Sequence, residues 1–131
     1  MAADNAVAND AEVHFVTHDL LAALPRLPLE GFDLIVSNPP YIRESERPMM
    51  RRNVLDYDPH LALFVPDSDP WVFYRPIAQY ASLHLNPQGL LALEINEALA
   101  NETASLLQGY GFNVALRQDF RGKDRLLWCS R

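Results

Sequence analysis

Five segments of the chain carry the apolar patterns of β-strands. Residues 33–37 and 89–95 are nearly continuous apolar runs, which are typical of parallel strands covered on both faces. Residues 13–17 and 112–118 alternate between apolar and polar side chains and are rich in β-forming residues. Residues 125–129 form the last apolar run, and this run is close enough to its predecessor to predict an antiparallel hairpin.

Two further segments have the spacing of amphipathic helices. The first opens at Asp69, with Pro70 in the first helical position, and its apolar spacing continues to Leu85. Pro76 lies inside this pattern, where a kink is expected. The second segment covers residues 97–108 and is followed by glycines that act as stop signals.

The remaining residues connect these elements. Residues 1–10 are small and polar, as at the frayed end of a helix. Residues 19–21 are followed by a short helix or turn that ends near residues 25–28, and residues 86–89 predict a turn. Residues 42–69 are rich in proline and charge, and a loop of this length is usually either functional or disordered.

The order of the elements predicts the fold class. Strands and helices alternate along the chain, and a hairpin closes it. We therefore expect an α/β fold whose sheet is mostly parallel and has an antiparallel C-terminal end. A chain of 131 residues is long enough for one domain with a real core.

Charge narrows the possible partners. Seventeen acidic and eleven basic side chains leave a net charge of −6, which argues against nucleic acid as the main partner. A local basic cluster at residues 51–52, near Arg43 and Arg47, is most simply a solvated loop. No apolar stretch is long enough to span a membrane, and the N-terminus has no signal-peptide pattern. The lone Cys129 permits no internal disulfide, so we expect a cytoplasmic protein. The four histidines have no metal-ligand spacing, and we expect no metal site.

A polar tetrapeptide follows directly on the strand predicted at residues 33–37. Asn38-Pro39-Pro40-Tyr41 therefore lies where a parallel strand ends, which is the edge where open α/β sheets bind ligands. The Asn38 amide can accept and donate hydrogen bonds, and the prolines hold their carbonyls in a rigid geometry. Tyr41 adds a flat apolar face with a polar tip. Together they predict a socket for a planar NH2-bearing group, such as a side-chain amide or a base amine. The plainer interpretation is a turn that ends a strand.

These residues resemble the motif of S-adenosylmethionine-dependent amino methyltransferases, and the whole chain from about residue 12 is similar to the release factor glutamine methyltransferases. The similarity extends through several further segments in the order that the family has them. These segments are Ile42, Tyr57-Asp58-Pro59-His60-Leu61-Ala62-Leu63 (with Asp58 in place of the family's Glu), Phe73-Tyr74, the Glu94-ending strand, Gly111-Phe112 and residues 119–125.

The resemblance implies a Rossmann-like class I methyltransferase fold and N5-methylation of a glutamine, expected to be the Gly-Gly-Gln glutamine of peptide-chain release factors. It implies that the Asn38 side chain and the Pro39 carbonyl receive the two amide hydrogens. Pro40 and Tyr41 would then shape and cover the slot. Two fixed acceptors would stabilise the positive charge that develops on the amide nitrogen as it attacks the methyl group in line, so no strong general base is needed.

For the cofactor, the resemblance implies that Asp19 contacts the adenine of S-adenosylmethionine, with Asn38 also at the cofactor site. Glu94 would either face the crevice or end its strand in solvent. The family binds this cofactor through a Gly-rich loop after its first strand. This chain has no such loop, because its five glycines are at residues 31, 89, 109, 111 and 122. We therefore expect residues 1–131 to be a single partial domain, the C-terminal half of the catalytic domain, with weak or absent cofactor binding and no activity alone.

The resemblance implies the strand order 3-2-1-4-5-7-6, in which strands one and two separate strand three from strand four. Residues 13–17 correspond to strand three and residues 33–37 to strand four. Without strands one and two, the strand expected at residues 13–17 has no neighbour, and the strand at residues 33–37 becomes an exposed edge. Such an edge invites pairing, so we expect self-association or a rearranged N-terminal segment. Two alternative functions stay open: a nucleic-acid adenine or cytosine amino methyltransferase, which the acidic charge disfavours, and a non-enzymatic α/β fragment or binding module.

Overall fold

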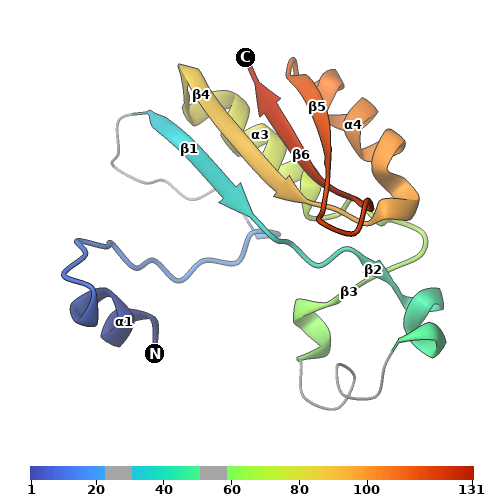
Figure 1. Ribbon diagram of the computed structural model, residues 1–131, viewed down its shortest axis with the longest axis horizontal. Helices are drawn as coiled ribbons and strands as arrows, with labels where there is room; N and C mark the ends of the chain where they lie inside the picture. Colours follow the sequence, from blue (N-terminus) through green and yellow to red (C-terminus); the bar gives the residue numbers. More distant parts are fainter. Residues whose placement is uncertain (23–30, 51–58) are drawn as a thin grey trace.

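The computed structural model describes residues 1–22, 31–50 and 59–131 (Figure 1). Its elements, with 3-10 helices written η, are α1 (Ala2–Ala8), β1 (Phe32–Ser37), β2 (Ile42–Arg43), η1 (Glu44–Met49), η2 (His60–Ala62), β3 (Phe64–Val65), α3 (Tyr74–His84), β4 (Leu85–Glu94), η3 (Glu97–Leu99), α4 (Ala100–Gly109), β5 (Asn113–Gln118) and β6 (Asp124–Ser130).

Four of the strands form the main sheet, in the order β1-β4-β6-β5. β1 runs parallel to β4, whereas β6 is antiparallel to both β4 and β5. The α/β class and the C-terminal hairpin are confirmed, but the expectation of a mostly parallel sheet is wrong for this chain. The physical reason is that the hairpin supplies two of the four strands and docks through β6 directly on β4. β2 and β3 form a separate, short parallel pair.

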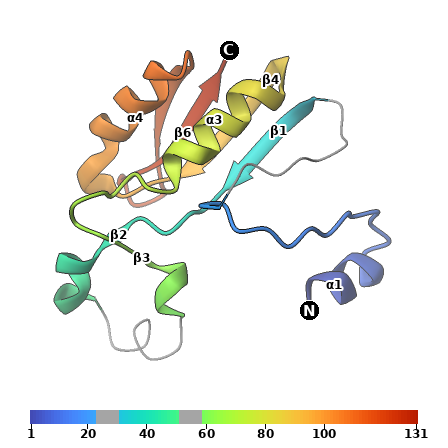
Figure 2. The same cartoon turned by 180° about the vertical axis from the view of Figure 1, so that it is seen from behind.

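The core lies between the sheet and two helices on one of its faces. α3 and α4 lie behind the sheet in Figure 1 and in front of it in Figure 2. Their apolar side chains pack with fully buried residues of the strands, among them Leu91 and Leu93 of β4 and Leu127 of β6. Leu107 of α4 is also fully buried, as the helical spacing predicts.

The opposite face of the sheet is apolar and largely open. Leu34 and Val36 of β1 are 55% and 69% exposed, and Trp128 of β6 is 44% exposed. In the ladder Leu34 lies opposite Leu90, while Ile35 lies opposite Leu91, so successive residues alternate between the open face and the helix face. The burial of β1 on both faces that its sequence predicts is therefore wrong in this chain. The predicted edge position of β1 is confirmed by the strand order.

The N-terminal segment differs from the sequence prediction. Residues 1–10 include the short helix α1, which has no buried residue. Residues 11–19 form no strand, and Val13, Phe15 and Val16 are 47%, 54% and 60% exposed. The strand predicted at residues 13–17 is wrong here because an extended segment becomes a strand only by pairing with a neighbour.

Two boundaries also move. Turns cover residues 70–73, and α3 begins at Tyr74 instead of Pro70. Pro76 therefore lies in the first turn of the helix, where its missing N–H has no intrahelical partner to lose. Residues 86–89, predicted as a turn, lie inside β4 as an irregularity of the ladder between its pairs Phe32–Leu85 and Leu34–Leu90.

Some predictions lie outside the described residues. These are the end of the short helix or turn near residues 25–28, the basic pair at residues 51–52, and the first two residues of the family-like segment that begins at Tyr57. In the part of the chain that the structure describes, no helix is long and apolar enough to cross a bilayer.

Candidate functional site

The tetrapeptide Asn38–Tyr41 connects the carboxyl end of β1 to β2. Because β1 and β4 are parallel, their carboxyl ends meet at one edge of the sheet. Ser37 pairs with Leu93 in this ladder, so the next residue, Asn38, comes beside Glu94, the last residue of β4. The tetrapeptide thus lies at the edge where the sequence places the ligand crevice.

A small hollow of about 70 Å³ lies at the tetrapeptide. Its walls come from two segments, and the lining residues are Asn38, Pro39, Pro40, Tyr41, Ile42, Ala62 and Leu63. The Ile42 N–H donates to the Leu63 carbonyl over 3.0 Å, which joins the two walls. Asn38 is exposed, whereas Pro39 is buried. The structure therefore brings together all four tetrapeptide residues predicted to bind an amide.

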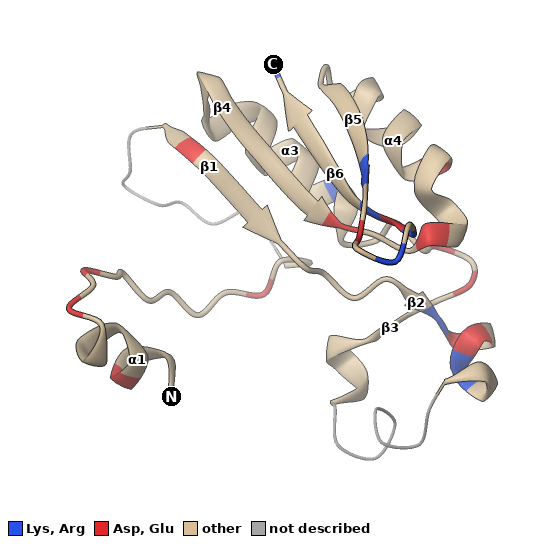
Figure 3. Ribbon diagram, viewed as in Figure 1, with Lys and Arg blue, Asp and Glu red and all other residues tan. Residues whose placement is uncertain are grey.

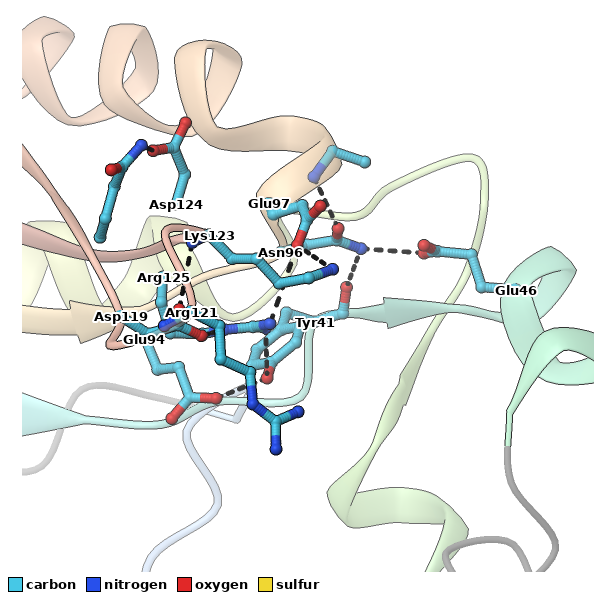
Figure 4. Close-up of polar contacts among 12 residues, drawn as sticks. Tyr41, Glu46, Glu94, Asn96, Glu97, Asp119, Arg121, Lys123, Asp124 and Arg125 are labelled. Carbon is cyan, nitrogen blue, oxygen red and sulfur yellow. Dashed lines mark hydrogen bonds and ion pairs between the residues drawn. The ribbon is translucent and has the colours of Figure 1, made fainter.

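The hydroxyl of Tyr41 is held between two side chains from other strands (Figure 4). It donates to Oε1 of Glu94 over 2.5 Å, and Nη1 of Arg125 donates to it over 3.4 Å. Burial, and next the hydrogen bond to the Glu94 carboxylate, raise the pKa of Tyr41 to about 12. Tyr41 is therefore a protonated donor at neutral pH.

The backbone of Tyr41 is also anchored. Nδ2 of Asn96 donates to the Tyr41 carbonyl over 3.2 Å and to Oε2 of Glu46 over 2.9 Å. The other amide atom of Asn96, Oδ1, accepts from the N–H of Ala98 over 3.0 Å and caps η3. A single side chain thus ties the tetrapeptide, the segment after β2 and the start of η3 together.

Charged residues of both signs gather near the carboxyl end of β4 (Figure 3). Arg125 lies 3.9 Å from Glu97 and 3.8 Å from Asp119, and Nζ of Lys123 lies 2.9 Å from Oε2 of Glu97. The β5–β6 hairpin therefore brings its turn to the carboxyl end of β4. These partly exposed pairs contribute little stability individually, and two of them place acidic side chains beside Arg125.

Asp19 is not part of this hollow. Its carboxylate accepts from the Leu21 N–H over 2.9 Å, and its carbonyl accepts from the Ala22 N–H over 3.1 Å. Asp19 is exposed, while its neighbour Leu20 packs against the core. Its proposed contact with an adenine stays a prediction. Among the described residues, no group of three or more His, Cys, Asp and Glu side chains could hold a metal ion.

The sequence left three residues of the site without a settled role. Glu94 was left open between the crevice and solvent, and Asn96 and Arg125 were given no role. Two signals were available: Glu94 interrupts an otherwise apolar strand, and Arg125 ends one of the family-like segments. The contact between Arg125 and Tyr41 could not be predicted, because 84 positions separate the two residues and only the docked hairpin brings them together.

Comparisons with known proteins now give the family context. No family model matches the chain. Among curated proteins it is 45% identical over 124 residues to the release factor glutamine methyltransferase of Flavobacterium psychrophilum, covering 94% of this chain and 43% of that protein. It is 42% identical to the protein of the same name from Bacteroides thetaiotaomicron, covering 93% of this chain and 44% of that protein. It is 36% identical to the Lactococcus lactis protein of that name, covering 97% of this chain and 46% of that protein.

The chain thus spans less than half the length of these relatives, and the matched region is their C-terminal part. The resemblance found in the sequence is confirmed. The chain is a relative of the release factor glutamine methyltransferases and corresponds to their C-terminal part.

Proposed function

We propose that the whole protein methylates N5 of a protein glutamine, and that this chain supplies the part of the active site that holds the glutamine amide. The observation that carries the proposal is the hollow at the carboxyl end of β1, lined by Asn38 to Tyr41 and anchored by Glu94 and Asn96. The names of the relatives, which specify a release factor and a glutamine, support the substrate class.

The chemistry fits a carboxamide. A glutamine amide presents two N–H donors in one plane, and the proposed acceptors are the Asn38 side-chain oxygen and the Pro39 carbonyl. An amide nitrogen is a poor nucleophile because its lone pair is delocalised. Fixed acceptors stabilise the positive charge that develops on this nitrogen during methylation. Pro40 and Tyr41 exclude other orientations by shaping the slot.

The substrate proposed is a peptide-chain release factor, methylated at its Gly-Gly-Gln glutamine. Ala62 and Leu63 supply apolar contacts on the far wall of the hollow, where the aliphatic stem of a glutamine would lie. The proposal commits to a protein amide in preference to a base amine, because the chain has a net charge of −6.

The methyl donor proposed for the whole protein is S-adenosylmethionine, contacted by Asp19 and Asn38. The hollow at the tetrapeptide is by itself too small for this donor, since sites for such ligands measure roughly 300–1,000 Å³ and this hollow measures about 70 Å³. Asp19 is not among its lining residues. We therefore propose that the chain alone is inactive and does not bind S-adenosylmethionine, which isothermal titration calorimetry tests. Micromolar binding would contradict this part of the proposal.

The activity itself is tested with a chimaera. Residues 12–131 replace the matching C-terminal region of the Flavobacterium psychrophilum relative, and methyl transfer to a purified release factor is followed by mass spectrometry of the Gly-Gly-Gln peptide. We expect methylation of that glutamine, and we expect Asn38→Ala to lower kcat by about 10²-fold. Because Asn38 is exposed, this substitution should leave thermal unfolding nearly unchanged.

The intact relative serves as the positive control, and a DNA duplex serves as the competing substrate. Methylation of adenine or cytosine in preference to the protein would favour the alternative of a nucleic-acid methyltransferase. A folded chimaera that methylates neither substrate would overturn the proposed function.

A further inference from the structure

The hydroxyl of Tyr41 links the candidate slot to two strands that do not line it. Glu94 ends β4 and Arg125 lies near the start of β6, and both side chains contact the Tyr41 hydroxyl. Neither Glu94 nor Arg125 is among the residues that line the hollow. Resting on the function proposed above, we propose that Glu94 and Arg125 are positioning residues that hold the Tyr41 ring in the orientation that closes the amide slot.

The first step of the argument is the hydrogen-bonding capacity of a phenol. A tyrosine hydroxyl has one hydrogen to donate and can accept from a neighbouring donor. In this structure it donates to Glu94 and accepts from Arg125, so both of its hydrogen-bonding roles are filled. A ring held at its tip by two partners and at its backbone by Asn96 has little freedom to rotate away from the slot.

The second step is that both partners are themselves fixed. The Glu94 carbonyl accepts from the Tyr74 hydroxyl over 2.8 Å, and Tyr74 is buried in the core. The Arg125 carbonyl accepts from the Ile95 N–H over 2.9 Å, so β4 and β6 are joined directly beside the site. The Arg125 side chain is only 29% exposed and also lies near Glu97.

The third step is the charge. Hydrogen bonds in which one partner carries a charge are roughly twice as strong as neutral ones, and the partners of the Tyr41 hydroxyl are the carboxylate of Glu94 and the guanidinium of Arg125. A neutral apolar side chain at either position would leave a half-buried hydroxyl without its partner. The Tyr41 ring would then sample other orientations, and misplacement of about 1 Å can lower a rate by 10²-fold.

The proposal is tested first on the chain of residues 1–131 by NMR. In the wild-type chain we expect a slowly exchanging resonance from the Tyr41 hydroxyl hydrogen, assigned by its absence in Tyr41→Phe. Glu94→Leu should abolish this resonance, whereas Glu94→Gln, which keeps an acceptor oxygen, should retain it. A resonance that is present and unchanged in Glu94→Leu would overturn the proposal.

The second test is a double-mutant cycle in the chimaera described above. Glu94→Leu and Tyr41→Phe should each lower kcat by roughly 10-fold or more, with a smaller change in KM for the release factor. If Glu94 acts through the Tyr41 hydroxyl, Glu94→Leu should lower kcat no further in the Tyr41→Phe background. Glu94→Gln should recover most of the rate.

The control is Glu102→Leu, an exposed glutamate on α4, which should leave kcat unchanged. Thermal unfolding of each variant separates loss of fold from loss of positioning, and Arg125→Met in both backgrounds repeats the cycle if Glu94→Leu does not fold. If Glu94→Leu lowers kcat by the same factor in the wild-type and the Tyr41→Phe backgrounds, the positioning role is overturned but the proposed function is not. A wild-type chimaera without activity would overturn the proposed function, and the positioning role with it.

Discussion

Tyr41 shows at the scale of one residue how a surface motif becomes a rigid site. Tyr41 lines the hollow, its hydroxyl lies between Glu94 and Arg125, and its carbonyl accepts from Asn96. The hydroxyl and the carbonyl of this half-buried residue therefore both have partners, as buried polar groups require. The sequence predicted Tyr41 as a site residue but could not show which side chains contact it.

Alkaline pH should reveal the environment of Tyr41. Its pKa is raised from 10.0 to about 12 by burial and by Glu94, so the folded state holds the proton more tightly than the unfolded state. The resulting stability is fully present below about pH 10 and is lost as pH rises towards 12. Chemical unfolding at a series of pH values should show this loss in the wild-type chain.

Tyr41→Phe is the control for that measurement, because other tyrosines also titrate in this range. The difference in unfolding free energy between wild type and Tyr41→Phe should shrink as pH rises from 10 to 12. A difference that is independent of pH would mean that the Tyr41 pKa is not raised.

At the scale of the element, the apolar pattern predicted what is local. β1, β4, β5, β6 and α4 lie where the sequence places them, apart from shifts of a few residues at their ends. The strand at residues 13–17 and the start of α3 at Pro70 were predicted wrongly. Strand formation depends on a partner that the pattern of one segment does not report, whereas an amphipathic helix forms its own hydrogen bonds.

Gly89 is a second position where the local sequence pattern does not report the pairing partner. A Cβ atom added here would lie 2.7 Å from the Phe32 carbonyl oxygen, so only glycine permits the close approach of β1 and β4 at this point. The sequence suggests a turn around Gly89, and the tertiary pairing turns the same residues into an irregularity inside a strand.

Two leucine substitutions should measure how strongly the helices are bound to the sheet. Leu107 of α4 is fully buried, and Leu107→Ala should destabilise the chain by about 2–5 kcal/mol through lost burial and a cavity. Leu83 of α3 is 65% exposed, and the matched change Leu83→Ala should alter the unfolding free energy by no more than about 0.5 kcal/mol. Urea denaturation of the two variants checks this, and similar losses would contradict the burial assignment.

At the scale of the whole molecule, the sheet is covered on one face only. α3 and α4 cover the face that carries the core (Figure 2). Leu34, Val36 and Trp128 are exposed on the other face. A parallel pair of strands is normally buried on both faces, and β1 is also an edge. An open edge beside an open apolar face favours association with another chain.

We therefore propose that the isolated chain self-associates through β1. Sedimentation should show dimers or larger species in the wild-type chain, and Val36→Lys should shift the distribution towards monomer, because a lysine on an edge strand opposes pairing. Val7→Lys is the matched control, since Val7 is 83% exposed and belongs to α1, which lies apart from the sheet (Figure 1). A wild-type chain that is monomeric at high concentration would contradict the proposal.

The sequence by itself determined the class of fold, the strands with strong apolar patterns, the tetrapeptide Asn38–Tyr41 at the end of one of them, and the family. Each of these features depends on residues that are neighbours in the chain, so it can be predicted from local sequence patterns without a structure. The tertiary structure alone decided that the hairpin docks on β4, that one face of the sheet stays open, and that Glu94 and Arg125 hold Tyr41. These features depend on contacts between segments far apart in the sequence, and such contacts exist only after the strands have paired.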